Sequence, residues 1–371
     1  MKIKRMLIVL CLAITAACSN DEPADNPTGG NPSNGGSTPT PSSIATVTKL
    51  DAFTTLPLEA IHFVNATTGY AVASKLNSGG SKSSSIYKTT DGANTWTKIY
   101  STSLFNIAKI KSKDANFLMA IAPTGEVLTT RDAGSTWSLN NALTGKNYHL
   151  TDLTFHTGDD EIYIVGYHET TKDGLMFIGI NDGAIWSKNI NAELTNLVKA
   201  TPLMATEYLA ATKLLVFSGG TSTKGALFTL YKAKYEREGN YTAAQLVDVA
   251  AKDGTVIAVG NNGLTNTGSE KGVMFGSVHN GDWNDVDYGH NNKLVAVALT
   301  RLSKNAVAVG RNTASQSTDG EFITVSKDNG NSWHSIKHSI TNGAWNDVYA
   351  LDADTFIAVG AQGMLAKIEI K

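Results

Sequence analysis

The sequence predicts an all-β protein built from repeated units of four strands. One repeated pattern is a turn with the order S/T-x-D-x-G-x-T/S-W, which reads TTDGANTW at Thr89–Trp96, TRDAGSTW at Thr130–Trp137 and SKDNGNSW at Ser326–Trp333. The other is an apolar run that ends in glycine, such as IYIVG at Ile162–Gly166 and VIAVG at Val256–Gly260. A catalytic site is usually built once, whereas a repeat every ~20–50 residues indicates a solenoid or a propeller. We therefore interpret the turn motif as structural.

The spacing of the repeats sets the number of units. Gly260, Gly310 and Gly360 follow one another at intervals of 50 residues, and another short apolar strand precedes each of these runs. Four strands in about 45–50 residues form one blade of a β-propeller. We place the units at about residues 57–101, 104–145, 149–193, 196–242, 245–290, 293–340 and 344–371.

The last unit is too short to form a complete blade. It ends at Met364–Lys371 after three strands, without a turn motif and without an outer strand. The missing strand is predicted at the other end of the chain, because TVTKL at Thr46–Leu50 resembles TWTKI at Thr95–Ile99, the outer strand of the first unit. Pairing of this N-terminal strand with the last blade removes two exposed sheet edges. Residues 44–371 are thus predicted to form a seven-bladed β-propeller closed by the N-terminal strand.

The first 18 residues are predicted to be a signal peptide. Three basic residues precede the apolar run Met6–Ile14, which is too short to span a bilayer as a stable helix. The run leads to TAAC, with small residues before Cys18, and this resembles a bacterial lipoprotein signal in which the cysteine is lipidated. An ordinary secretory signal that is cleaved nearby is the alternative.

Residues 19–43 predict a flexible tether, because they are mostly Asn, Pro, Gly, Ser, Thr and acidic residues with little to bury. The acidic stretch SNDEPAD at Ser19–Asp25 resembles the surface-export signals of lipoproteins in the Bacteroidetes group. The resemblance implies a protein anchored to the outer membrane through Cys18 that faces the cell surface. An anchor that faces the periplasm is the alternative.

Composition excludes several classes of partner. The chain has 31 Lys and Arg against 33 Asp and Glu, and removal of the signal makes it more acidic. Without a basic block, it is not expected to bind nucleic acid or a membrane through a polybasic patch. The two cysteines are Cys11 and Cys18, so the folded part is stabilised without a disulfide.

The turn motif and the strand pattern together resemble the Asp-box, or bacterial neuraminidase repeat (BNR repeat). The pattern of residues within each unit is also similar to that in the propellers of the photosystem II assembly factor family. The resemblance covers nearly the whole chain after the tether, and it implies fold more than function, because such propellers host unrelated activities. It also implies that the motif aspartates accept hydrogen bonds from their own turns and that the tryptophans pack into the sheets. The structural residues predicted in this way are Asp91, Trp96, Asp132, Gly134, Trp137, Asp328, Gly330 and Trp333.

No catalytic site is predicted with named residues. A sialidase needs a cluster of three arginines, whereas only four arginines follow the signal and one of them, Arg131, lies inside a turn motif. Other glycoside hydrolases need two opposed carboxylates. The candidates for such a pair are Asp173, Glu270, Asp285, Asp287 and Asp319. The eight histidines show no metal-binding spacing and no phosphate loop occurs, so we expect no metal and no cofactor.

The predicted binding face is the one that carries the loops between the second and third strands of each unit. These loops are short in units two and seven and longer in the other five, as at residues 218–225 in unit four, and function concentrates in long loops. The candidate ligand-binding residues in them are Lys172, Lys224, Asn262, Lys271 and Arg311. We expect a binding or assembly module for a protein or a glycan, without catalysis. The alternative is a glycan-active hydrolase that uses a carboxylate pair on this face.

Overall fold

A computed structural model describes most of the chain from Ser43 onward. The described residues are 43–76, 80–156, 160–221, 224–232, 234–242, 245–262, 271–278, 284–285, 293–311, 322–340 and 344–371. Internal contacts separate residues 1–42 from residues 43–371. The predicted signal, its lipidation site at Cys18 and the tether up to residue 42 lie outside the described residues.

The first half of the described chain forms three four-stranded antiparallel sheets. The first sheet contains β2 (Leu58–Phe63), β3 (Gly69–Leu76), β4 (Lys82–Thr89) and β5 (Thr97–Thr102). The second contains β6 (Lys109–Ser112), β7 (Leu118–Ile121), β8 (Val127–Thr130) and β9 (Ser138–Asn140). The third contains β10 (Tyr148–Phe155), β11 (Ile162–His168), β12 (Gly174–Ile180) and β13 (Ile185–Lys188).

Four more four-stranded sheets follow among the described residues. The fourth contains β14 (Leu203–Leu209), β15 (Leu214–Thr221), β16 (Lys224–Tyr231) and β17 (Lys234–Thr242). The fifth contains β18 (Gln245–Lys252), β19 (Thr255–Asn262), β20 (Lys271–Val278) and β21 (Asn284–Asp285). The sixth contains β22 (Lys293–Leu299), β23 (Ala306–Arg311), β24 (Ile323–Ser326) and β25 (His334–Ser335). The seventh contains β26 (Trp345–Ala350), β27 (Thr355–Gly360), β28 (Leu365–Ile370) and β1 (Ala45–Lys49).

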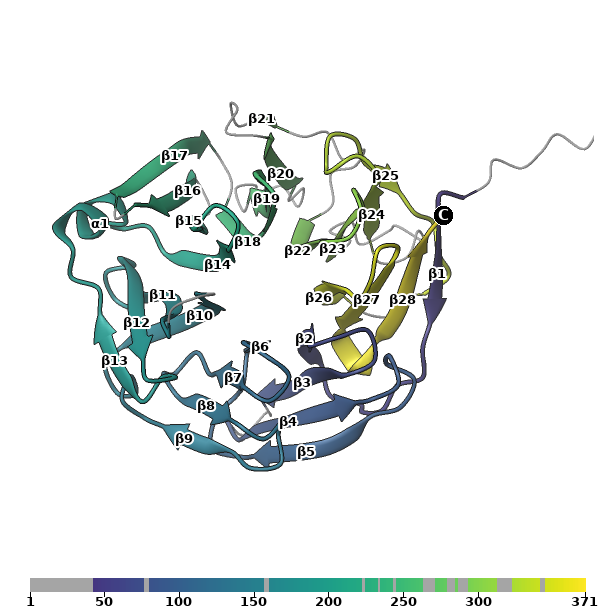
Figure 1. The fold of residues 1–371 in the computed structure, drawn as a ribbon, viewed down its shortest axis with the longest axis horizontal. Helices are drawn as coiled ribbons and strands as arrows, with labels where there is room; N and C mark the ends of the chain where they lie inside the picture. Colours follow the sequence, from purple (N-terminus) through teal and green to yellow (C-terminus); the bar gives the residue numbers. More distant parts are fainter. Residues whose placement is uncertain are drawn as a thin grey trace, which may run out of the picture. The chain divides into compact units, whose positions relative to one another are not determined.

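The sheets are arranged around a common centre, with the first strand of each sheet innermost (Figure 1). We call β2, β6, β10, β14, β18, β22 and β26 the inner strands. This arrangement confirms the predicted all-β propeller with four-stranded antiparallel blades. In the seventh sheet, β1 is antiparallel to β28, with Ala45 opposite Ile370 and Lys49 opposite Ala366.

The glycine that ends each apolar run is required by a close approach of two strands. A Cβ atom at Gly166 would lie 2.1 Å from the carbonyl oxygen of His149, and one at Gly260 would lie 1.9 Å from that of Gln245. At the same place the inner strand carries a β-bulge, for example between Leu150 and Asp152. A bulge re-aims the side chains that follow it. The repeated glycine therefore marks the point where an inner strand changes direction.

The repeated turn is held by its own aspartate. The Asp132 carboxylate accepts hydrogen bonds from the Thr136 backbone N–H at 2.8 Å, the Thr136 hydroxyl at 2.6 Å and the Thr130 hydroxyl at 2.8 Å. These bonds, the one from the Thr136 hydroxyl foremost, lower the pKa of Asp132 to about 2. Gly134 has a φ of +89°, which suits glycine, and a Cβ atom there would lie 2.5 Å from Ile99. Asp91 and Asp328 make the corresponding bonds in their own turns.

We expect Asp132→Ala to lower the melting temperature by a few degrees, because it leaves the donors of an exposed turn without their acceptor. Binding of any partner should stay unchanged, because the carboxylate has all its contacts within the turn. Thermal unfolding followed by circular dichroism, beside a binding measurement, checks this. Loss of binding at an unchanged melting temperature would assign the aspartate a functional role.

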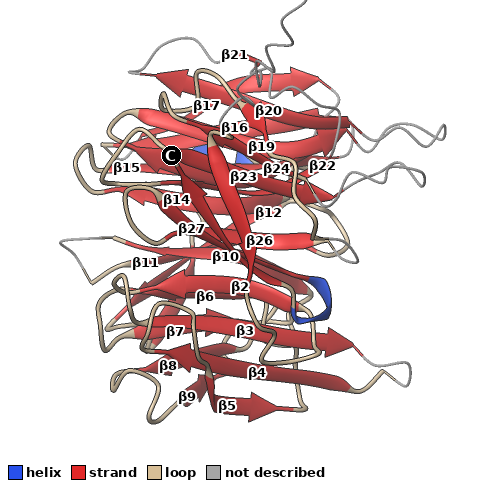
Figure 2. Ribbon diagram, turned by 90° about the vertical axis from the view of Figure 1, so that its right-hand side faces the viewer, coloured by secondary structure: helices blue, strands red, loops and turns tan. Residues whose placement is uncertain are grey.

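Two local features differ from the sequence prediction. A short helix, α1 (Ala192–Leu197), precedes β14; its first turn is capped by Asn191, whose side-chain oxygen accepts the N–H of Glu193. The long loop expected at residues 218–225 is instead a continuation of β15 and β16, which pair as far as Thr221 and Lys224. Apart from α1 and a short 3₁₀ helix, η1 (Ala361–Gly363), the regular elements described are strands (Figure 2). None of the described helices has the length and apolar character needed to cross a membrane.

Candidate functional site

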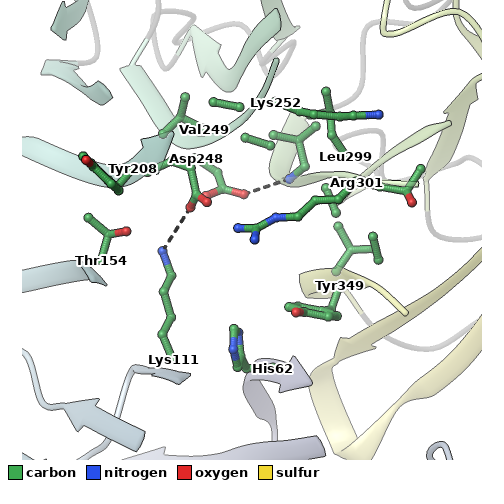
Figure 3. Close-up of a pocket in the computed structure, with 18 of the residues that line it drawn as sticks. His62, Lys111, Thr154, Tyr208, Asp248, Val249, Lys252, Leu299, Arg301 and Tyr349 are labelled. Carbon is green, nitrogen blue, oxygen red and sulfur yellow. Dashed lines mark hydrogen bonds and ion pairs between the residues drawn. The ribbon is translucent and has the colours of Figure 1, made fainter. Parts of the chain in front are cut away.

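A polar cavity of about 580 Å³ lies at the centre of the propeller, between the inner strands. Its walls come from the second half of these strands and from the turns that follow them, including Lys252, Arg301 and Asp352 (Figure 3). These are the turns against which the repeated motifs pack, since Ala133 donates to the Asn116 carbonyl and Asn329 to the Lys304 carbonyl. We call this space the central cavity. It lies toward the face of the repeated turns.

Three aspartates occupy the same position in alternate blades, directly after the bulge of the inner strand. They are Asp152, Asp248 and Asp347. Each carboxylate accepts a backbone N–H from the inner strand of the next blade. The donors are Thr206 N to Asp152 at 2.9 Å, Val297 N to Asp248 at 2.8 Å and Ile61 N to Asp347 at 3.0 Å. The three carboxylates therefore join neighbouring blades.

The blade that receives each of these bonds has alanine at the same position. These residues are Ala205, Ala296 and Ala60, and each follows the bulge of its own strand. Three aspartates and three alanines account for six sheets, so one of the seven described sheets has no place in the alternation. That sheet is the second, where Lys109 pairs with Ile121 at the equivalent position. Among the seven described sheets the alternation leaves one position unassigned, and lysine occupies it.

The carboxylates around the central cavity hold Lys109 in its charged form. Burial opposes the charge, but the attraction of Asp347, Asp248 and Asp152 outweighs it and raises the pKa of Lys109. An isolated charge is costly in such an environment unless opposite charges compensate it. Lys109 and the three aspartates are therefore best treated as one interdependent group.

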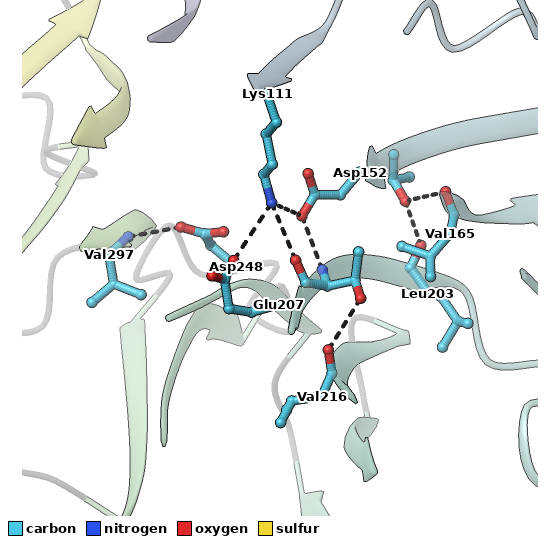
Figure 4. A network of polar contacts seen from close by, with 10 residues as sticks. Lys111, Asp152, Val165, Leu203, Glu207, Val216, Asp248 and Val297 are labelled. Atoms are coloured by element: carbon cyan, nitrogen blue, oxygen red, sulfur yellow. Dashed lines mark hydrogen bonds and ion pairs between the residues drawn. The ribbon is translucent and has the colours of Figure 1, made fainter. Parts of the chain in front are cut away.

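Lys111 forms a second link between blades, two residues further along β6. Its ammonium lies 3.2 Å from the Asp152 carboxylate, 3.7 Å from the Glu207 carboxylate and 3.2 Å from the Thr206 carbonyl, to which it donates (Figure 4). Burial acts against its charge, yet Asp152 and Glu207 raise the pKa of Lys111. One side chain thus connects the second, third and fourth blades.

An uncharged aromatic pair forms another part of the wall. The His62 ring lies 4.9 Å from the Tyr349 ring, edge to face, and its Nε2 is 2.8 Å from the Ser112 hydroxyl. Burial, with the nearby charges of Lys111 and Arg301, lowers the pKa of His62 to about 3. The Tyr349 hydroxyl donates to the Phe63 carbonyl at 2.7 Å. Both rings are therefore neutral at physiological pH.

Two half-buried groups that line the cavity make stability depend on pH in opposite directions. Burial raises the pKa of Asp248 to about 7, against the attraction of Lys109. The folded chain holds this proton more tightly than the unfolded chain. The contribution of Asp248 to the free energy of unfolding is therefore full below pH ~4 and is lost as the pH rises to ~7. For His62, with its lowered pKa, the contribution is full above pH ~6.5 and is lost as the pH falls toward ~3.

We expect Asp248→Asn to remove the part of the pH dependence of stability that Asp248 contributes. The asparagine keeps an oxygen for the Val297 N–H and cannot ionise, so at pH ~7.5 the variant should unfold with a free energy about 1–4 kcal/mol above that of the wild type. The difference should vanish near pH ~4. Urea unfolding across this range checks it, with the exposed Asp253→Asn as control. A difference between the chains that is independent of pH would contradict the assignment.

The five predicted ligand-binding residues lie at the opposite ends of the second and third strands, away from the central cavity. Lys172 is in the loop after β11, with its ammonium 3.3 Å from Glu169 and over the Tyr167 ring. Lys224, Asn262 and Lys271 are strand ends, and Asn262 pairs with Lys271. Arg311 ends β23 and donates to the Asn346 side chain at 2.7 Å. Nothing tests their role, which stays a prediction.

The carboxylates suggested for a hydrolase do not form a described pair. Asp173 accepts the Ala200 N–H at 2.7 Å, and this bond foremost lowers its pKa. Asp285 is in β21, and Glu270, Asp287 and Asp319 lie outside the described residues. Within the part of the chain that the structure describes, no group of three His, Cys, Asp or Glu residues could hold a metal ion.

The aspartates of the central cavity were not predicted from the sequence, although the sequence carries a signal for them. The inner strands read LTD at Leu150–Asp152, LVD at Leu246–Asp248 and WND at Trp345–Asp347. An acid at the third position of these segments, three times at the same place in the repeat, is that signal. Lys109 is not recognisable in this way, because its role follows from the ring and not from its own strand.

Comparison with known proteins supports the fold. No family model and no curated protein sequence matches the chain. Among solved structures it is similar to YCF48 bound to a D1 peptide, at 13% identity and a TM-score of 0.63, over 88% of this chain and 97% of that one. YCF48 from Cyanidioschyzon merolae matches at 14% identity and a TM-score of 0.63, over 87% and 98%. These likenesses establish the fold alone.

A likeness to an enzyme is also present. The GH74 enzyme of Niastella koreensis is 17% identical, with a TM-score of 0.58, over 82% of this chain and 51% of that chain. The chain therefore spans about half the length of that enzyme. Propellers that bind and propellers that hydrolyse share this architecture, so function must be argued from the side chains.

Proposed function

We propose that this chain is a lipid-anchored extracytoplasmic module that binds a segment of a protein partner, without catalysis. The anchor is the predicted lipid at Cys18, and the module faces outward from the outer membrane on the predicted tether. The seven-bladed ring, closed by the N-terminal strand, is the rigid platform of this proposal. A glycan is the other ligand to which the predicted loops are suited.

The observation that carries the proposal is the state of the central carboxylates. Asp152, Asp248 and Asp347 are each committed to a backbone N–H of the next blade. A glycosidase needs one carboxylate that is free to attack or to activate water and another that protonates the leaving group. Carboxylates that join blades are poorly placed for either role. A similar propeller, YCF48, is known with a bound D1 peptide, which supports a peptide ligand here.

The proposed docking surface is the loop rim that contains Lys172, Lys224, Asn262, Lys271 and Arg311. Four of the five are cationic on an acidic chain, so an anionic segment of a partner is favoured. Exposed ion pairs are screened beyond a Debye length of ~8 Å at physiological ionic strength. Binding on this rim should therefore weaken as salt is added.

The test is affinity capture from envelope extracts with the full chain. The variant replaces Lys224, Lys271 and Arg311 with serine, and a matched control replaces the exposed Lys98, Lys188 and Lys304, which lie away from the rim. We expect the captured partner to be lost with the first variant and at high salt, and to be kept with the control. A partner held equally by both variants and indifferent to salt would place the docking surface elsewhere.

One observation favours the hydrolase alternative. The Asp248 carboxyl, with its pKa raised to about 7, could serve as a general acid at neutral pH. It lines the central cavity and not the loop face where the sequence places a carboxylate pair. Release of reducing ends from a soluble β-glucan by the wild type, and its absence in Asp248→Asn, would establish this alternative.

A further inference from the structure

Arg301 offers the central cavity a positive charge that none of the described residues engages through a hydrogen bond or an ion pair. It follows β22 in the turn to β23, and its side chain is exposed. Its guanidinium points into the space between Asp248 and Tyr349 (Figure 3). A guanidinium presents five donors in a planar fork that matches a carboxylate. The residue is thus built for an anionic group that the chain itself does not supply.

The carboxylates of the neighbouring blades have other partners. Asp248 and Asp347 accept backbone N–H groups, and Asp152 accepts one in addition to the Lys111 ammonium. Pairing with Arg301 would require these side chains to leave the contacts that join the blades. The charge of Arg301 therefore remains available to a ligand.

Glu207 provides the complementary charge within the same cavity. Its side chain is 25% exposed, and its nearest cation, the Lys111 ammonium, is 3.7 Å away. A carboxylate has about four acceptor positions, so one distant ammonium leaves most of them free. Burial raises the pKa of Glu207, against the charges of Lys111 and Arg301.

The wall of the central cavity also contains a neutral surface. His62 and Tyr349 form their edge-to-face pair there, and the charge of Arg301 acts on both rings. A volume of about 580 Å³ falls within the range of ~300–1,000 Å³ found for small-molecule sites. A ligand of this size can reach both charged groups and cover the aromatic pair.

We propose that the central cavity binds a small zwitterion of the amino-acid class, with its carboxylate on Arg301 and its ammonium on Glu207. A dianion such as phosphate is disfavoured, because the cavity already holds Asp152, Asp248 and Asp347. A simple amine is disfavoured by Arg301 and Lys111. This site lies on the face opposite the loop rim, so it goes beyond the proposed function and does not depend on it.

The experiment is a thermal-shift screen of the purified full chain with each of the twenty standard L-amino acids. The best binder is then measured by calorimetry beside two matched analogues, the same molecule without its amino group and the same molecule without its carboxylate. We expect both analogues to bind at least tenfold more weakly. If no amino acid binds, or if either analogue binds as tightly, the proposal is wrong.

Variants assign the two ends of the ligand. Arg301→Gln should weaken binding of the amino acid at least tenfold without weakening that of the amine analogue. Glu207→Gln should weaken binding of the amino acid at least tenfold without weakening that of the deaminated acid. Lys304→Gln removes an exposed cation of the same turn that does not line the cavity, and should change nothing. Equal affinity in wild type and Arg301→Gln would overturn the assignment.

The result is independent of partner capture on the loop rim. Arg301→Gln should retain the captured partner, and serine at Lys224, Lys271 and Arg311 should retain the amino acid. The failure of one proposal thus leaves the other measurable.

Discussion

Deletion of residues 44–54 is expected to lower the melting temperature by about 10 °C or more, corresponding to at least ~5 kcal/mol. The deletion removes β1, including Ala45, which is buried against the core of the seventh sheet. It also removes Phe53, whose ring stacks 4.8 Å from that of Trp96 in the first blade. The edge of β28 would then be open to pairing with another chain. Thermal unfolding and light scattering measure the two effects.

A deletion of equal length in the predicted tether, residues 25–35, is the control and should leave the melting temperature unchanged. The comparison tests the predicted closure of the ring by the N-terminal strand. If the chain without residues 44–54 has the same melting temperature as the full chain, the ring closes without β1.

Lys109→Met is expected to lower the free energy of unfolding by about 3–5 kcal/mol at pH ~7.5, because it leaves buried carboxylates without their common cation. Asp248→Asn in the same chain should restore part of this loss, since it removes one of the charges that Lys109 balances. Urea unfolding of the single and double variants gives the coupling. Lys98→Met, on the exposed face of β5, is the control.

The sign of the coupling is decisive. If Lys109 balances the aspartates, Asp248→Asn stabilises the Lys109→Met chain by more than the about 1–4 kcal/mol by which it stabilises the wild type. A double variant whose loss equals the sum of the two single effects would mean that Lys109 and Asp248 act independently, and the interpretation of the alternating positions would be wrong.

The propeller fold could be predicted from the sequence because the same local constraints on the chain recur in successive units. Gly260 and Gly310 recur because a Cβ atom at either position would lie 1.9 Å from a carbonyl oxygen, and such a constraint is visible in any single strand. Asp132 and Asp328 recur because a turn of this shape needs an acceptor for its own N–H groups. Constraints that act within one unit produce the same residues at the same place in successive units, and this periodicity is visible in the sequence.

The site was harder to predict because its residues do not follow a rule within one unit. Unequal loop lengths led to the predicted binding face around Lys172 and its counterparts, which stays a prediction. The central cavity instead depends on what the inner strands place opposite one another: Lys111 meets Glu207 across two blades. Among the described residues Arg301 has no hydrogen-bond or ion-pair partner, and no pattern in the sequence reveals this. The loop at residues 218–225 was wrong because β15 and β16 extend further than their glycines suggested.

The central claim is that the carboxylates of the central cavity hold blades together and do not catalyse. The most direct test measures two properties of wild type and Asp248→Asn at pH ~7.5: the release of reducing ends from soluble β-glucans, and the free energy of unfolding. The account predicts no release by either chain and an asparagine variant at least as stable as the wild type. Hydrolysis by the wild type that Asp248→Asn abolishes at unchanged stability would contradict it.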